Sequence, residues 1–94
     1  MSRTKLQPSE LSELLENLSG WELKDDYLTR IISFDNFINA WGFMCQIALI
    51  AESMDHHPDW KNVYSTVEIK LSTHDAGGLT VLDFELAQKI NNLL

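Results

Sequence analysis

The 94-residue sequence has a single cysteine, Cys45, so it cannot form a disulfide within the chain. Residues 43–50 around it are apolar except for Gln46, and we expect Cys45 to be a small buried hydrophobic residue in a protein of a reducing compartment. The N-terminus lacks the apolar core of a signal peptide, and the longest nearly apolar run, residues 40–51, is short for a bilayer span. We therefore expect a soluble, cytoplasmic protein without a membrane partner.

Basic residues are also scarce: seven Lys and Arg stand against fourteen Asp and Glu, which gives a formal net charge of −7. A chain of this charge repels a phosphate backbone unless its few cations gather on one face. The cations are scattered along the sequence instead, at Arg3, Lys5, Lys24, Arg30, Lys61, Lys70 and Lys89. We therefore expect no direct binding to nucleic acid.

The short motifs of metal and nucleotide sites are missing as well. The sequence has no HExxH and, with one cysteine, no paired CxxC ligands. Adjacent residues such as His56 and His57 rarely bind one ion together, so zinc is only a minor alternative. Gly77 and Gly78 lack the spacing and the following basic residue of a phosphate-binding loop. We expect no metal site.

The composition fits one globular domain covering residues 1–94, with 45% hydrophobic, 10% aromatic and 22% charged residues. A chain this short buries a modest fraction of its surface, so association with other copies can add stability. Pro8 suits the first turn of a helix that Gly20 ends, with one apolar face made by Leu11, Leu14, Leu15 and Leu18. Residues 21–24 and 27–34 then predict a hairpin, with Asp25 and Asp26 in its turn.

The middle of the sequence predicts a long helix that Ser33 or Asp35 caps. Its apolar positions step by four and three along one stripe, formed by Phe37, Trp41, Met44, Ala48 and Ala51. The opposite side is hardly polar, since it carries Ile38, Phe43, Ile47 and Ile50. Either this helix is buried on most sides or part of it meets another subunit.

Residues 60–64 and 66–73 predict a second hairpin, in which Val67, Ile69 and Leu71 alternate with polar residues. His74 ends the second strand, just before the two glycines that permit a sharp turn. Thr80 and Asp83 have the spacing of a capping box for a last helix, whose apolar stripe is Leu82, Leu86, Ala87, Ile90 and Leu94. The predicted fold is α+β, in the order α-β-β-α-β-β-α, with a four-stranded antiparallel sheet and helices on one face.

The strongest functional signal is the stretch ESMDHHPDWKNVY at residues 52–64. His56 and His57 fall where Pro58 should end the long helix, and His74 falls at a strand end. Histidine changes charge near neutral pH, so these side chains form a candidate proton-transfer site. For each histidine a structural or solvated role is the alternative. Glu52 lies one turn before His56 and can hold an imidazole in place, with a solvated carboxylate at the helix end as the equal alternative. Asp55 and Asp59 flank the pair and divide in the same way between site and surface, and Asp83 by itself favours a capping role.

Taken together, these residues resemble the pterin-4a-carbinolamine dehydratase family, also called 4a-hydroxytetrahydrobiopterin dehydratases. The resemblance runs from about residue 21 to the C-terminus and is weak over the first helix. Its elements are Glu52, His56, His57, Pro58, Trp60, Asn62, Val63 and Tyr64, then LSTH at 71–74, GLT at 78–80, Asp83 and Ala87. The GFM at 42–44, after Phe34 and Phe37, also fits.

The resemblance implies a lyase that dehydrates a 4a-hydroxytetrahydropterin to a quinonoid dihydropterin in tetrahydrobiopterin recycling, without a metal or organic cofactor. It implies that His56, His57 and His74 are catalytic residues lining the pterin pocket. We expect His56 and His74 to transfer protons and His57 mainly to bind. The implied substrate-binding residues are Glu52, Asp55, Pro58, Asp59, Trp60, Thr73 and Asp83, although Trp60 can equally belong to the core.

Family members form dimers and tetramers, which agrees with the apolar middle helix, so we expect a homodimer or homotetramer. Some animal members bind a homeodomain transcription factor through protein contacts. The alternative function is therefore a protein-interaction module that acts as a dimerisation cofactor or transcriptional coactivator. The enzyme hypothesis rests on one geometric expectation, that three imidazoles face a common hollow wide enough for a bicyclic ring.

Overall fold

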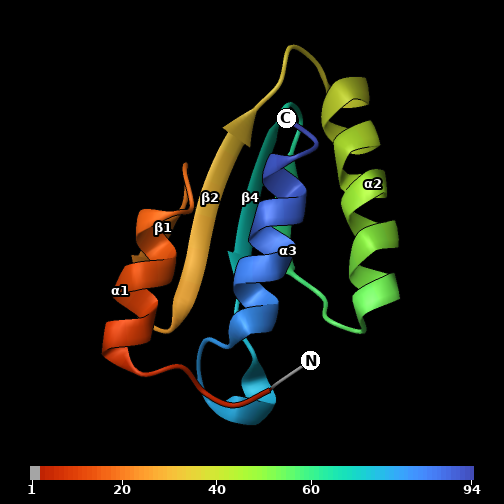
Figure 1. The fold of residues 1–94 in the computed structure, drawn as a ribbon. Helices are drawn as coiled ribbons and strands as arrows, with labels where there is room; N and C mark the ends of the chain where they lie inside the picture. The colour runs from red at the N-terminus through yellow and green to blue at the C-terminus, as the bar shows by residue number, and fades with distance from the viewer. Residues whose placement is uncertain (1–2) are drawn as a thin grey trace.

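A computed structural model describes residues 3–94, which form a four-stranded antiparallel sheet packed against three helices (Figure 1). The elements follow in the order α1 (Pro8–Glu16), β1 (Glu22–Lys24), β2 (Tyr27–Ser33), α2 (Phe37–Met54), β3 (Asp59–Val63), β4 (Thr66–Leu71), η1 (His74–Ala76) and α3 (Val81–Asn91). The strand order across the sheet is β1-β2-β4-β3. The predicted α+β fold is confirmed, with the short 3-10 helix η1 as an addition between β4 and α3.

The covered face of the sheet forms the core. Val67, Ile69 and Leu71 of β4 are fully buried, whereas Lys70 between the last two is exposed. Leu28 of β2 lies opposite Leu71 and is also fully buried. Because side chains alternate along a strand, this burial means that one face of β4 meets the helices and the other does not. The alternation predicted for the second hairpin is confirmed.

The first hairpin is confirmed as well, with Lys24 of β1 paired to Tyr27 of β2. Asp25 in its turn has a φ of 53°, a left-handed conformation that Asp tolerates better than most residues. The prediction that Gly20 ends the first helix is wrong. α1 ends at Glu16 with Asn17 as its C-cap, and Gly20, with a φ of 85°, forms the turn that leads into β1.

The last helix begins as predicted, with a capping box between Thr80 and Asp83. Four residues of its predicted apolar stripe are buried, namely Leu82, Leu86, Ala87 and Ile90. The fifth prediction is wrong, because α3 ends at Asn91 and Leu94, beyond it, is 53% exposed. Burial of α3 against the sheet fixes the position of Asp83 in its first turn.

The long helix α2 is present, but its buried side differs from the prediction. The buried residues are Ala40, Phe43, Met44, Ile47 and Ala51, of which the predicted stripe contained only Met44 and Ala51. Phe37 and Trp41 are 44% and 53% exposed. The cap also differs, since the Asn36 side chain accepts the N–H of Asn39 at 2.8 Å, in place of Ser33 or Asp35. A helix that is apolar all round does not reveal its inner side by periodicity.

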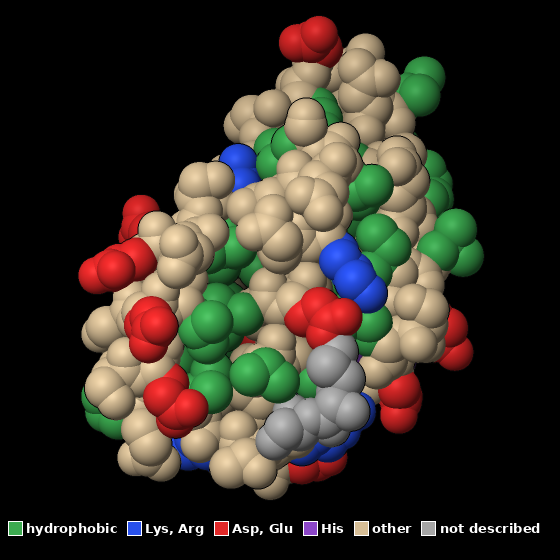
Figure 2. Space-filling view, viewed as in Figure 1, with side chains coloured by type: hydrophobic (Ala, Val, Ile, Leu, Met, Phe, Trp, Pro, Cys, Tyr) green, Lys and Arg blue, Asp and Glu red, His purple; other side chains and the backbone are tan. Residues whose placement is uncertain are grey.

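The outer side of α2 is apolar and open to solvent. Cys45 lies on it and is exposed, so its predicted burial is wrong. Figure 2 shows hydrophobic side chains along the edge of the molecule that α2 forms. By length and composition, with 18 residues and a mean hydropathy of 1.2, α2 could cross a membrane. Core helices of soluble proteins meet the same criterion, and the buried side of α2 packs in the core of this domain.

Candidate active site

Sheet register brings the two histidine segments to one end of the sheet. Asp59, the first residue of β3, pairs with Lys70 near the end of β4, and Leu28 near the start of β2 pairs with Leu71. Since neighbouring strands are antiparallel, the segment before β3 and the segment after β4 leave the sheet at the same end. The first segment carries His56 and His57, and the second carries Thr73 and His74.

A left-handed turn at the end of α2 places His56. Asp55 has a φ of 51° and a ψ of 41°, its N–H donates to the Glu52 carbonyl at 3.2 Å, and the His56 N–H donates to the Ala51 carbonyl at 3.1 Å. This pair of bonds is a Schellman motif, which closes a helix around one left-handed residue. The two histidines follow the end of the helix, as predicted, but α2 ends at Met54 through this motif, before the residue that precedes Pro58.

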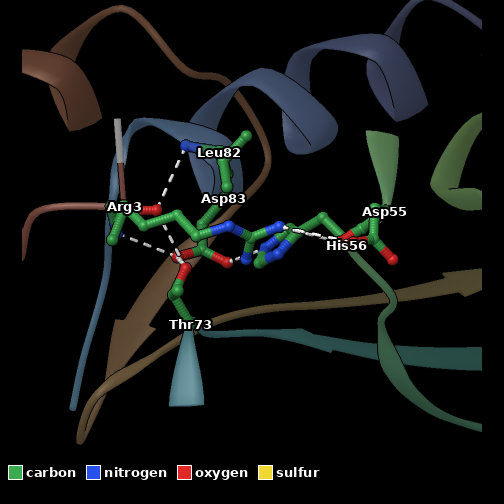
Figure 3. A network of polar contacts seen from close by, with 7 residues as sticks. Arg3, Asp55, His56, Thr73, Leu82 and Asp83 are labelled. Atoms are coloured by element: carbon green, nitrogen blue, oxygen red, sulfur yellow. Dashed lines mark hydrogen bonds and ion pairs between the residues drawn. The ribbon is translucent and has the colours of Figure 1, made fainter. Parts of the chain in front are cut away.

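The centre of the site is Asp83, which is fully buried in the first turn of α3 (Figure 3). Its Oδ1 lies 2.6 Å from Nε2 of His56, which is 5% exposed. Its Oδ2 accepts the hydroxyl of Thr73 at 2.8 Å and the N–H of Thr80 at 2.9 Å. Asp83 thus joins the end of α2, the segment after β4 and the start of α3, and it acts as a cap and as the partner of a histidine.

Hydrogen-bond donors and acceptors in this network favour one tautomer of His56. The Thr73 hydroxyl donates to Asp83, so its oxygen accepts the hydroxyl of Thr80 at 2.8 Å, and the Thr80 oxygen accepts the Leu82 N–H at 3.2 Å. Oδ2 of Asp83 accepts two hydrogen bonds, as a carboxylate does, so we assign the proton of the short contact to Nε2 of His56. Nδ1 then remains to take up or release a proton.

His57 lies outside this network. Its Nε2 lies 2.8 Å from Oε1 of Glu52, and the two side chains are 55% and 80% exposed. Glu52 contacts an imidazole, as one of its two expected alternatives states, but the ring is that of His57, because the left-handed residue Asp55 turns His56 toward Asp83 and leaves His57 beside Glu52. An exposed pair of this kind contributes little to stability.

His74 begins η1 and is exposed. Its ring packs edge-on against Tyr27, with ring centroids 6.4 Å apart and an interplanar angle of 70°. Thr73 before it is held by Asp83 and by a bridge to Gly78, in which the Thr73 N–H donates to the Gly78 carbonyl at 3.0 Å. The sequence analysis did not single out Tyr27 or the hydroxyl of Thr80, although the Thr80–Asp83 spacing identified the cap.

The remaining predicted residues lie around this end of the sheet. Asp55 is exposed, and its carbonyl accepts a hydrogen bond from Arg3 at 3.0 Å. Pro58 is half-buried and Asp59 is exposed. Trp60 pairs with Ile69 and packs against the core, which agrees with the core role left open for it. Trp60 and Asp59 also line a shallow hollow of about 170 Å³ with Lys61, Glu68 and Lys70.

Four hollows of the described surface lie apart from the three histidines. They have volumes of about 480, 390, 170 and 370 Å³, and their linings include none of the three. The first is nearest to the Asp83 network, since Met54 and Leu82 line it. Residues 3–94 also contain no group of three or more His, Cys, Asp or Glu side chains that could hold a metal ion. A common hollow for three imidazoles stays a prediction.

Comparisons with known proteins agree on one family. The sequence model described as "Pterin 4 alpha carbinolamine dehydratase" matches residues 4–93. A protein of Prochlorococcus marinus strain MIT 9303 is 50% identical over 93 residues, which are 99% of this chain and 97% of that protein. One from Mesorhizobium japonicum is 49% identical over 94 residues, covering 98% and 96%. Both carry the name "Putative pterin-4-alpha-carbinolamine dehydratase".

A solved structure has the same fold. It is a crystal structure from Brucella melitensis, described as a transcriptional coactivator/pterin dehydratase. It superposes with a TM-score of 0.92 at 43% sequence identity, over 96% of this chain and 98% of the Brucella chain.

Proposed function

Because the chain belongs to the pterin 4 alpha carbinolamine dehydratase family, we propose that it is a hydro-lyase acting on a 4a-hydroxytetrahydropterin by histidine acid–base catalysis. The observation that carries this proposal is the buried contact of 2.6 Å between His56 and Asp83, which supplies one oriented imidazole. In a cell with an aromatic amino acid hydroxylase, the product would return to that enzyme's tetrahydropterin cofactor.

The proposed reaction needs one acid and one base. The bond between C4a and its hydroxyl oxygen breaks, and a proton must reach that oxygen so that it leaves as water. A ring nitrogen loses its proton, and its electron pair forms the double bond of the quinonoid dihydropterin. One proton is delivered and one is removed, so no oxidant, reductant or metal is required.

His56 suits the role of base. With Nε2–H donating to Asp83, Nδ1 carries the free electron pair. When Nδ1 takes the ring proton, the buried carboxylate stabilises the imidazolium that forms. Asp83 is fully buried and Thr73 is 2% exposed, so both act through His56 as positioning residues and do not touch the pterin.

His74 and His57 complete the proposed site from the solvent side. We assign the proton delivered to the hydroxyl oxygen to His74, which is exposed and held at one edge by Tyr27. His57, exposed beside Glu52, is assigned to binding. Asp55, Pro58, Asp59 and Trp60 border the same segment and stay candidates for contact with the pterin ring or its substituent.

The test is to incubate the protein with freshly generated 4a-hydroxytetrahydropterin and to follow dihydropterin formation by absorbance. We expect a rate well above the buffer blank. A rate equal to the blank, from a protein whose circular dichroism shows it folded, would overturn the proposal.

A second candidate function, a protein-interaction module or transcriptional coactivator, is favoured by the exposed apolar side of α2 and by the description of the Brucella relative. It predicts that replacing His56 and His74 by Ala leaves partner binding and cellular phenotype intact. Loss of the phenotype in this double variant, if it folds, would count against the second function and for the enzyme.

A further inference from the structure

The segment before α1 runs across the end of the sheet at which the candidate site lies, and Figure 1 shows it crossing the loop around η1. We call residues 3–6 of this segment the strap. Its first residue, Arg3, contacts the end of α2 just before His56, and its last residue, Leu6, contacts the loop between β4 and α3 that carries His74. The proposed reaction has so far assigned no role to the strap.

Arg3 holds the peptide bond that leads into His56. Its Nη2 donates to the Asp55 carbonyl at 3.0 Å, and Figure 3 shows the Arg3 side chain reaching Asp55. The N–H of the same peptide bond belongs to His56 and donates to the Ala51 carbonyl at 3.1 Å. Because both polar groups of this peptide are bonded, its plane is fixed. Arg3 thus stabilises the backbone orientation that directs His56 toward Asp83.

Charge makes Arg3 a suitable partner for the end of α2. The last turn of α2 contains no basic residue of its own, and Glu52 and Asp55 add two carboxylates there. The carbonyl groups at the C-terminus of a helix carry partial negative charge, which a cation stabilises. Arg3 brings that cation from the other end of the chain, and its Nη2 also lies 4.0 Å from the Asp55 carboxylate.

The other end of the strap is anchored on the loop that carries His74. The Leu6 N–H donates to the Leu79 carbonyl at 2.8 Å, and Leu6 is buried in the core. Between the two anchors the strap passes close to Gly78, since a Cβ atom at Gly78 would lie 2.9 Å from Cε of Lys5. Gly78 has no positive φ, so this close approach, and not backbone freedom, favours glycine there.

We propose that the strap holds the two histidine segments in place relative to each other, and that Arg3 is a positioning residue for the dehydration, acting through the peptide bond between Asp55 and His56. Asp83 joins the same two segments from the inside of the protein, and the strap joins them at its surface. The expected effect on rate rests on the proposed function, whereas the contacts of the strap do not.

The first test is steady-state kinetics of Arg3→Met, which keeps a long apolar stem and loses the hydrogen-bond donors. We expect kcat to fall about 3- to 10-fold, since one hydrogen bond that positions a catalytic group is lost, and KM to stay within about twofold. Lys89→Met is the matched control, because Lys89 and Arg3 line the same hollow of about 480 Å³ and each substitution removes one positive charge. An unchanged kcat in Arg3→Met, or equal losses in the two variants, would overturn the positioning role.

A rescue experiment separates positioning from general stability. In Arg3→Ala, guanidinium chloride at concentrations far below those that unfold proteins should raise kcat, because the ion can occupy the place of the lost side chain. Sodium chloride at equal concentration should not. Sucrose, which stabilises folded proteins without supplying a guanidinium group, should not either. Recovery with sucrose and none with guanidinium would show that Arg3 acts only on stability and would overturn the proposal.

Amide hydrogen exchange measured by NMR tests the contact without the reaction. In Arg3→Met the His56 amide should exchange about 3- to 10-fold faster than in the unaltered chain, because its peptide loses one of two hydrogen bonds. The Ile47 amide, in the middle of α2, should exchange at an unchanged rate. Unchanged exchange at His56 would overturn the strap. If the unaltered chain dehydrates no faster than the buffer blank, the dehydratase proposal fails, and this exchange result still decides whether the strap holds His56.

Discussion

Nε2 of His56 lies 2.6 Å from Oδ1 of Asp83, across 27 positions of sequence, and the two side chains are 5% and 0% exposed. This contact joins the end of α2 to the start of α3. Oδ2 of the same carboxylate holds Thr73, the residue before His74. One buried acid thus sets the ring orientation of one histidine and the backbone position next to another.

Removing the charge of Asp83 should destabilise the fold. In Asp83→Asn an NH2 group replaces one of the two carboxylate oxygens. If it replaces Oδ1, His56 loses its buried acceptor, and if it replaces Oδ2, Thr73 loses its buried acceptor. We expect a loss of about 1–3 kcal/mol in the free energy of unfolding, measured in urea. Glu85→Gln on the same helix, where Glu85 pairs with Lys89 at 3.3 Å near the surface, should change stability by less than about 0.5 kcal/mol. Equal losses in the two variants would argue against the network.

The two adjacent histidines should differ in effect. His57 is more than half exposed beside Glu52, so His57→Ala should change the free energy of unfolding by no more than about 0.5 kcal/mol. If His57 mainly binds, this variant should raise KM for the pterin and leave kcat nearly unchanged. Steady-state kinetics separate the two parameters. A fall in kcat with unchanged KM would contradict a binding role and would indicate that His57 takes part in proton transfer.

The hydroxyl of Thr80 should matter more than its methyl group. It accepts the Leu82 N–H at 3.2 Å and donates to Thr73 at 2.8 Å. Thr80→Ala loses both hydrogen bonds in a fully buried position. We expect the free energy of unfolding, measured by thermal unfolding, to fall by about 1–2 kcal/mol. Thr80→Ser keeps the hydroxyl and should recover most of this loss. A serine variant as unstable as the alanine variant would show that packing of the methyl group dominates.

Asp55 should tolerate glycine better than a β-branched residue. Its φ of 51° is a left-handed conformation that costs a side chain about 1–2 kcal/mol, and glycine avoids that cost. Asp55→Gly should therefore keep or raise the melting temperature, and Asp55→Val should lower it. A Val variant as stable as the Gly variant would contradict the left-handed conformation of residue 55 at the end of α2.

The sequence predicted the features that local chemistry determines. Alternation in β4 and the Thr80–Asp83 spacing each reflect neighbours a few residues apart, and both are confirmed. The partner of His56 is a tertiary contact over 27 positions, so no local pattern identified it. The inner side of α2 and the exposure of Cys45 were missed because a helix with apolar residues all round gives periodicity no contrast. The Glu52–His57 pair was missed because spacing rules assume a continuous helix, whereas Asp55 is left-handed.

The most direct test of the account is the rate at which His56→Ala dehydrates freshly generated 4a-hydroxytetrahydropterin, compared with the unaltered chain. The account predicts a rate well above the buffer blank for the unaltered chain and a fall of about 10²- to 10⁴-fold in the folded variant, because one positioned base is lost. A His56→Ala rate within about threefold of the unaltered chain would lie far outside that range and would contradict it.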